Sequence, residues 1–317
     1  MRFRHFLLTK FNLGLYPADE NQAHRDKSGQ APARDPDRWM AERLELFDMY
    51  CVPSVMNQSN KDFTWLVVFD AKTPSEHRER IERYRDDCVL VPLFAESRCR
   101  DESHVVASRF KGKILRFFHF EAALPAVQDY IAQRLDEDTK YVITTRLDND
   151  DAIHSDFVRR VQDFLPAESP AKPGLLTKLI YKWTLDRPPR PESLFDRQMF
   201  KLVQRFSRRL VTEHVRNQER FAVNFTCGYA LEEKKAGLFS NERNSFVSLI
   251  EKTNQAGRLL TVWAIDHKKV NELARVLEID AEPMWVRVVH ERNLLNRFVG
   301  EEVPLNKITA SDFGFNP

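Results

Sequence analysis

The chain has 317 residues, 42% of them hydrophobic and 30% charged, which is the balance of a globular protein with a sizeable buried core. Lys and Arg total 49 and Asp and Glu 47, so the net charge of +2 excludes strong electrostatic steering towards nucleic acid. No apolar run reaches the roughly 18–20 residues of a membrane span, and the four cysteines form no CxxC pair that would indicate a zinc or redox motif. A reduced, cytoplasmic setting is therefore expected.

Strands and helices alternate through the first half of the chain. Apolar and β-branched runs predict strands at residues 3–13, 63–69, 88–94, 114–120 and 141–147. Helices are predicted at residues 38–55, 121–135 and 152–165, with a further one capped by Thr73 or Ser75. Asp37 is the expected cap of the first helix, and Pro53 its expected end or kink. This alternation predicts an α/β fold with a mainly parallel sheet.

The strand predicted at residues 141–147 ends in three aspartates within four residues. Because side chains alternate along an extended chain, Asp148 and Asp150 point the same way, and their carboxylates repel each other. A Mg²⁺ or Mn²⁺ ion removes that repulsion and takes carboxylate and phosphate ligands together. The alternative is that Asp150 or Asp151 caps the helix that follows.

Glycine is scarce, and its placement excludes two common nucleotide-binding motifs. The chain has nine glycines, and none forms a GxG arrangement. A dinucleotide fingerprint and a phosphate-binding loop are therefore both missing from the sequence. If the protein binds a nucleoside diphosphate, a metal ion has to take the part that a glycine-rich loop plays elsewhere.

The second half begins after Pro166 with a proline-containing connector. A basic amphipathic helix is predicted to begin at Arg197 and end at Arg220, and it either contacts an anionic membrane surface or is an ordinary solvated helix. Further on, a strand is predicted at residues 221–231, a helix at 244–255 and a strand at 259–265, followed by a tail from residue 286 with a mixed helical pattern.

The strand predicted at residues 259–265 ends in Asp266 and His267, which form a second candidate site. A carboxylate and an imidazole at a strand end could join a metal ion or act on a proton. The alternative is that His267 is structural.

Several segments together resemble the rhamnosyltransferases, a bacterial family of nucleotide-sugar-dependent glycosyltransferases of the GT-A type. They are FLLTKFNLGLY, VPSVMNQSNKDFTWLVVFD, ITTRLDNDDAI, NFTCGYA, NSFVSLIE and VWAIDH. They occur in this order from near the start of the chain to about residue 270. The order of the segments is more specific than any single one.

The resemblance implies a GT-A-like, Rossmann-type sheet in which residues 1–165 bind the sugar-nucleotide donor and residues 166–317 face the acceptor, with a helical C-terminal region. It makes RLDNDD the DxD motif of such enzymes. By similarity, the metal ligands are Asp148, Asp150 and His267, and the donor-binding residues are Thr9, Asn12, Asp70, Arg146 and Asp148. The Glu-Asp motif that supplies the catalytic base in many inverting relatives is not evident. Asp266, Asp151 and His267 are the candidates for that base.

The function predicted is metal-dependent transfer of a sugar, rhamnose by family resemblance, from a nucleoside diphosphate to a glycan or lipid-linked acceptor in surface polysaccharide synthesis. In the reaction, charge develops on the leaving diphosphate, where a cation stabilises it. A sugar nucleotidyltransferase is one alternative, although the glycine-rich N-terminal loop of those enzymes is missing. A non-catalytic sugar-nucleotide or polysaccharide-binding protein is another. The location expected is cytoplasmic, with peripheral contact to the inner membrane through the predicted basic helix.

Overall fold

The computed structural model describes residues 2–16, 35–87, 90–96, 106–110, 113–117, 123–166, 219–253, 259–264, 266–290 and 297–317. Its largest element is a seven-stranded main sheet of order β12-β8-β11-β6-β1-β2-β3. The strands are β1 (Phe3–Lys10), β2 (Thr64–Asp70), β3 (Leu90–Ala95), β6 (Tyr141–Arg146), β8 (Arg220–Phe225), β11 (Ser248–Lys252) and β12 (Arg275–Ile279). Pairing is parallel except at β11, which runs antiparallel to both β6 and β8. The mixed α/β class and a mainly parallel main sheet are confirmed.

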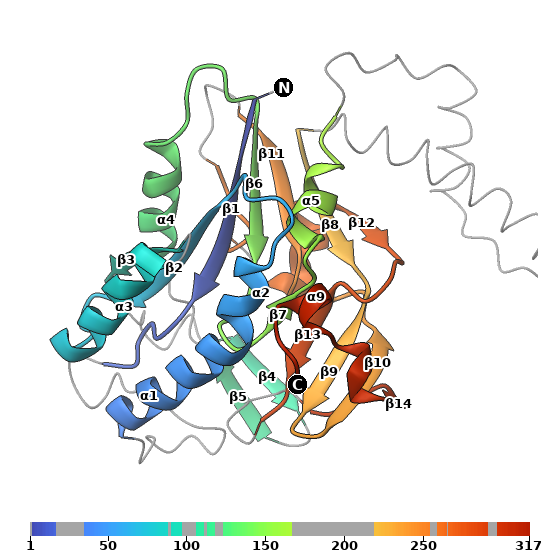
Figure 1. Ribbon diagram of the computed structural model, residues 1–317. Coiled ribbons are helices and arrows are strands. Elements are labelled where there is room, and N and C mark those ends of the chain that lie inside the picture. Colours follow the sequence, from blue (N-terminus) through green and yellow to red (C-terminus); the bar gives the residue numbers. More distant parts are fainter. Residues whose placement is uncertain are drawn as a thin grey trace, which may run out of the picture.

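The order of strands reverses at β1. The chain adds β2 and β3 on one side of β1 and then returns to place β6 on the other side. Figure 1 shows β1 and β6 side by side with their arrowheads in the same direction. In open α/β sheets, a ligand crevice forms outside the carboxyl ends of the strands at such a reversal. The ends of β1 and β6 are therefore the first place to look for a site.

Both faces of the main sheet are buried, because successive side chains of each strand point to opposite sides. Leu7 packs on one face with α1 (Pro36–Leu46) and α2 (Val52–Met56), which lie in front of the sheet in Figure 1. Leu8 packs on the other face with α4 (Ala123–Ala132). The near-continuous apolar runs of β2 and β6 follow from this two-sided burial. The remaining larger helices are α3 (Ser75–Asp87) and α5 (Phe157–Gln162).

The first helix begins two residues earlier than the sequence predicted. The Asp35 side chain accepts hydrogen bonds from two backbone N–H groups of the first turn, and Pro36 takes the first helical position, where an N–H donor is not needed. The prediction that Asp37 is the cap is wrong, because Asp37 lies inside that turn.

The helix also continues past Pro53. A π-helical turn (Phe47–Cys51) joins α1 to α2, and the backbone N–H of Val52 bonds to the carbonyl of Phe47, five residues earlier. Pro53 then lies at the start of α2, where its lack of an N–H donor is tolerated. Of the two outcomes predicted for Pro53, an end of the helix is wrong, and the π-helical turn just before it is the type of irregularity at which helices kink.

A second sheet, of order β14-β10-β9-β13-β7, lies beside the main one. Its strands are β7 (Ala152–Ile153), β9 (Cys227–Glu232), β10 (Lys235–Ser240), β13 (Trp285–Val288) and β14 (Glu301–Val303). The helix predicted at 152–165 therefore starts as β7, and α5 begins only after Asp156. Asp150 and Asp151 do not cap it. A hairpin, β4 (Val106–Phe110) and β5 (Lys113–Phe117), completes the strands of the described residues.

Two predictions for the second half are wrong. Residues 244–255, predicted as a helix, contain β11, because its backbone groups pair with β6 and β8 on both sides. Residues 259–264, predicted as part of a strand, form loop and turn instead. After them come a 3₁₀ turn (His267–Lys269) and α8 (Val270–Leu273).

The described tail residues contribute β13, β14, a 3₁₀ turn (Leu305–Lys307) and α9 (Ala310–Phe313), so the mixed helical pattern predicted from residue 286 holds only in part. The basic helix predicted between Arg197 and Arg220 lies outside the described residues, except that Arg220 opens β8. No helix in the described part of the chain is long and apolar enough to cross a bilayer.

Candidate active site

The carboxyl ends of β1 and β6 carry a cluster of charged side chains centred on Arg146. The Arg146 guanidinium donates to Asp148 Oδ1 from Nε at 3.2 Å and from Nη2 at 3.0 Å, and its Nη1 lies 3.0 Å from His267 Nδ1. Asp266 Oδ1 lies 3.3 Å from the same His267 nitrogen. The structure therefore brings together four residues that the sequence named in two separate motifs.

The protonation of this cluster follows from burial and from Arg146. Burial, and then the Arg146 guanidinium, lower the pKa of His267 to about 4, so its imidazole is neutral near pH 7 and can accept from Arg146. Burial acts to raise the pKa of Asp266, but the backbone N–H bond from Lys268 and the nearby charges of Lys268 and Arg146 outweigh it and lower that pKa. Asp266 is thus an ionised carboxylate whose side chain is 49% exposed.

Lys10, at the end of β1, adds a further cation that the sequence analysis did not single out. Its Nζ lies 4.9 Å from the ring centroid of Trp263, within the range of a cation–π contact. Surrounding protein atoms limit its hydration, and together with Arg146 they lower the pKa of Lys10 to about 8, although the residue keeps exposed surface. Lys10, Trp263 and Arg146 therefore form one rim beside Asp148.

Asp150 belongs to a different, more buried group. Its Oδ2 accepts from Arg43 Nη1 at 2.5 Å and lies 3.0 Å from His290 Nε2. Burial acts to raise the pKa of Asp150, but Arg43 and His290 lower it, so the carboxylate is ionised. Arg43 and His290 are missing from the sequence prediction. His290 lies two residues after β13, but the sequence indicated a helical pattern there, so nothing in it singled out His290.

Asp151 is held inside the protein. Its Oδ1 accepts the N–H of Val288 at 3.0 Å, which ties the aspartate run to β13. Burial, and then the neighbouring Asp150 and Asp148, raise the pKa of Asp151 well above its ordinary range. Asp151 is therefore placed as a structural acid with little access to a ligand.

Three predicted donor-binding residues, Thr9, Asn12 and Asp70, are buried and hydrogen-bonded within the protein. Thr9 Oγ1 accepts from the Trp65 indole N–H at 3.0 Å. Asp70 accepts the backbone N–H groups of Gly14 at 2.8 Å and of Lys72 at 2.9 Å, and Asn12 Oδ1 accepts the Asp70 N–H at 3.0 Å. These bonds fix the loop after β1. Contact between these side chains and a donor stays a prediction.

The three predicted metal ligands do not converge. Among the described residues, the group of acidic and imidazole side chains whose ligand atoms all lie within 4.8 Å of one another is Asp37, Glu76 and His77, two of them exposed. Asp148 and His267 share Arg146, whereas Asp150 has His290 beside it. The histidine beside Asp150 is therefore His290 rather than His267.

The region that contains the candidate site matches the model of one protein family. A family model described as "Putative rhamnosyl transferase" matches residues 4–104, 106–169 and 199–302, a span that contains every site residue named above. A search of curated proteins finds no match to the chain. Because the family model covers most of the chain, this protein belongs to the putative rhamnosyl transferase family, whose name assigns glycosyl transfer to its members.

Proposed function

We propose that this protein is a glycosyltransferase of the GT-A type that takes a sugar, rhamnose by its family, from a nucleoside diphosphate bound at the carboxyl ends of β1 and β6. The observation that carries the proposal is the gathering of Lys10, Arg146 and the Asp148–Asp150 run at the point where the strand order reverses. Residues 1–165 supply the donor half in this proposal, and residues 166–317 the acceptor half.

The rim of the site suits a nucleoside diphosphate. Arg146 and Lys10 are cations that can make charge-assisted hydrogen bonds to phosphate oxygens. Trp263 offers an aromatic face to a base or a sugar ring. The Asp148 side chain is 36% exposed, so it can reach a ligand, whereas that of Asp150 is 10% exposed.

We place the divalent cation of this proposal beside Asp150. Asp150 Oδ2, His290 Nε2 and Asn149 Oδ1 lie 2.5, 3.4 and 3.5 Å from one point, which is the Nη1 atom of Arg43. A carboxylate, an imidazole and an amide oxygen are ligand types that Mn²⁺ accepts. We assign Asp150 and His290 as the ligands, in place of His267. When bound, such an ion supplies positive charge to the leaving diphosphate.

The catalytic base in this proposal is Asp266. It is ionised and half exposed, and the Lys268 N–H donates to it at 2.9 Å. Asp151, the other carboxylate considered, is buried and bonded to the Val288 N–H, and its raised pKa favours the protonated form. A base needs access to the acceptor hydroxyl, and of these two carboxylates only Asp266 is exposed at the surface.

The test is calorimetry with uridine and deoxythymidine diphosphates, with and without Mn²⁺. Binding to the wild-type protein is expected to require the metal, and Asp150→Asn is expected to weaken it by at least about tenfold, since a charged ligand atom is lost. The matched control is Asp62→Asn, which neutralises an exposed aspartate elsewhere and is expected to bind as the wild type does.

Binding that ignores both the metal and Asp150→Asn would contradict the proposal. Slow metal-dependent hydrolysis of a bound nucleoside diphosphate sugar separates a transferase from a non-catalytic sugar-nucleotide-binding protein. A sugar nucleotidyltransferase is distinguished by release of pyrophosphate from a nucleoside triphosphate.

A further inference from the structure

We propose that Arg43 is a built-in cation of the Asp150–His290 pair and that it competes with a divalent metal ion for that pair. The inference rests on the proposed function, because it concerns the same metal site. It adds a residue from α1, a helix outside the aspartate motif, and it predicts that the site binds metal weakly until the Arg43 guanidinium moves away.

The contacts of Arg43 show one nitrogen placed where a metal would have to lie. Nη1 of Arg43 is 2.5 Å from Asp150 Oδ2, 3.4 Å from His290 Nε2 and 3.5 Å from Asn149 Oδ1. These atoms come from three separate parts of the chain: α1, the turn after β6 and the residues after β13. The Asp150 and Asn149 oxygens accept from Nη1, whereas His290 Nε2 donates to the ionised Asp150 carboxylate, so the cage around this positive charge consists of two acceptor oxygens with the imidazole beside them.

The Asp150 carboxylate is buried, and a buried carboxylate requires a positive charge beside it. The side chains of Arg43 and Asp150 are 11% and 10% exposed, and that of His290 is 16% exposed. An ionised carboxylate so far from water needs a nearby cation. Arg43 supplies it to Asp150 in the same way that Arg146 supplies it to Asp148.

The guanidinium and a metal ion cannot both occupy the cage. A Mg²⁺ ion binds oxygen at about 2.0–2.1 Å, and the Arg43 nitrogen already lies 2.5 Å from the same oxygen. Two cations this close would also repel each other. The Arg43 guanidinium carbon lies 5.1 Å from the ring centroid of Trp39, one turn earlier in α1, so an aromatic face is at hand when it leaves Asp150.

The test measures binding of Mn²⁺ alone, in the absence of nucleotide, from the electron paramagnetic resonance signal of the free ion. Arg43→Gln removes the competing charge and is expected to bind Mn²⁺ at least about tenfold more tightly than the wild type. The double variant Arg43→Gln/Asp150→Asn is expected to lose that gain. Arg38→Gln is the matched control, because Arg38 lies on the same helix, pairs with Glu42 and has a side chain that is 74% exposed.

The proposal would be overturned if Arg43→Gln bound Mn²⁺ as weakly as the wild type or more weakly. Arg43 would then be a positioning residue for the ligands. A gain that survives in the double variant would overturn it too, because the ion would then bind elsewhere.

Loss of a buried partner can prevent folding, so Arg43→Lys is the second variant. It keeps the positive charge, so it is expected to bind Mn²⁺ about as weakly as the wild type; a gain as large as that expected for Arg43→Gln would contradict competition by charge. Because no nucleotide is present, these results do not depend on donor binding. If nucleoside diphosphates fail to bind while Arg43→Gln still gains affinity for Mn²⁺, the proposed function fails and the competition stands.

Discussion

At the scale of single residues, the two carboxylates considered for the catalytic base differ in their surroundings rather than in their chemistry. Asp266 accepts the Lys268 N–H at 2.9 Å and keeps half of its side chain in water. Asp151 accepts the Val288 N–H at 3.0 Å but lies among other aspartates in the interior. Hydration and neighbouring charge push their pKa values in opposite directions, and this difference is the reason for proposing Asp266 as the base.

Asp266→Asn is therefore expected to lower the turnover of sugar transfer by about 100-fold, the lower end of what a general base contributes. The amide oxygen of Asn can still accept the Lys268 N–H, so the local fold and the dissociation constant of the donor should not change. Steady-state kinetics and donor calorimetry measure the two quantities. The control is Asp280→Asn, an exposed aspartate near the end of β12. Unchanged turnover in Asp266→Asn would rule Asp266 out.

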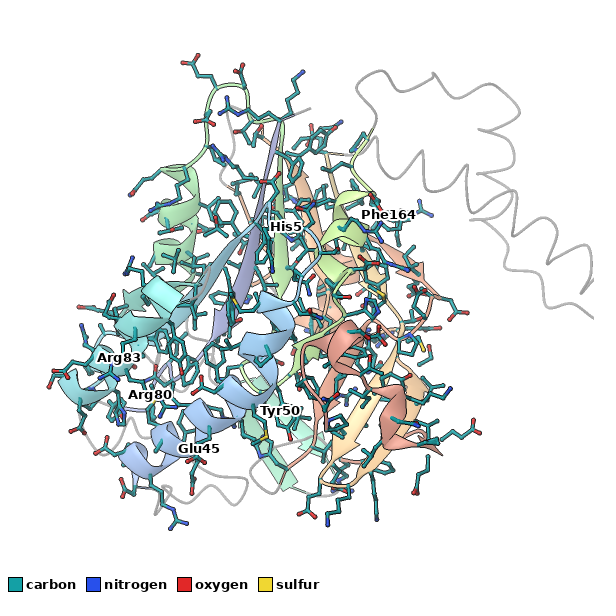
Figure 2. All side chains as sticks on the ribbon, viewed as in Figure 1. His5, Glu45, Tyr50, Arg80, Arg83 and Phe164 are labelled. Carbon is teal, nitrogen blue, oxygen red and sulfur yellow. The ribbon has the colours of Figure 1, made fainter. Side chains whose placement is uncertain are left out.

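At the scale of elements, a buried polar chain links three neighbouring strands of the main sheet. His5 Nε2 in β1 lies 2.8 Å from Thr145 Oγ1 in β6, and that oxygen lies 2.7 Å from Ser248 Oγ in β11. Figure 2 shows His5 among other side chains inside the molecule, whereas Arg80 and Arg83 lie at its edge. Burial lowers the pKa of His5 to about 3, so the folded protein holds it neutral.

This lowered pKa predicts a dependence of stability on pH. The unfolded chain protonates His5 below its ordinary pKa of 6.5, whereas the folded chain does so only near 3. The contribution of neutral His5 to the free energy of unfolding is thus complete above pH 6.5, and it is lost as the pH falls below that value. Between pH 7.5 and 5.0, the free energy of unfolding of the wild type should fall by about 2 kcal/mol relative to His5→Gln.

Urea unfolding of both proteins at the two pH values measures this difference, and groups that titrate alike in both proteins cancel. A difference between wild type and His5→Gln that stays constant from pH 7.5 to 5.0 would show that His5 is not held neutral.

At the scale of the whole molecule, the last residues of the chain close the structure over α2. Gly314 has a φ of +82°, a left-handed conformation, and a Cβ at this position would lie 2.3 Å from the Pro53 carbonyl oxygen. The side chain of Asn57 donates to the carbonyls of Ala310 and Ser311 at the same contact. The end of the chain therefore holds α2, which packs behind the aspartate run.

Gly314→Ala is expected to lower the free energy of unfolding by about 2 kcal/mol, from the strain of the left-handed conformation and the clash with backbone. The measurement is urea unfolding followed by circular dichroism. Lys307→Ala, an exposed change in the same terminal segment, is the control and should unfold as the wild type does. An unchanged midpoint for Gly314→Ala would show that α2 and the chain end can separate without cost.

Local chemistry was enough to predict much of the main sheet. The runs that became β1, β2 and β6 are apolar on both faces because helices cover both sides, and such runs are readable from sequence. Residues 244–255 were misread, because Phe246, Val247, Leu249 and Ile250 fit the spacing of a helix as well as that of a buried strand. The segment forms the strand β11 because its backbone groups pair with those of β6 and β8.

The sequence by itself determined the family, the α/β class and the aspartate run at the end of β6, because these follow from residue type and spacing along a short stretch. Only the tertiary structure decided which cation and which histidine each aspartate meets. Arg43 and Asp150 are 107 positions apart, and Asp150 and His290 are 140 apart. Contacts over such separations depend on how the strands and helices pack against one another. The local spacing of residues along the chain does not predict that packing.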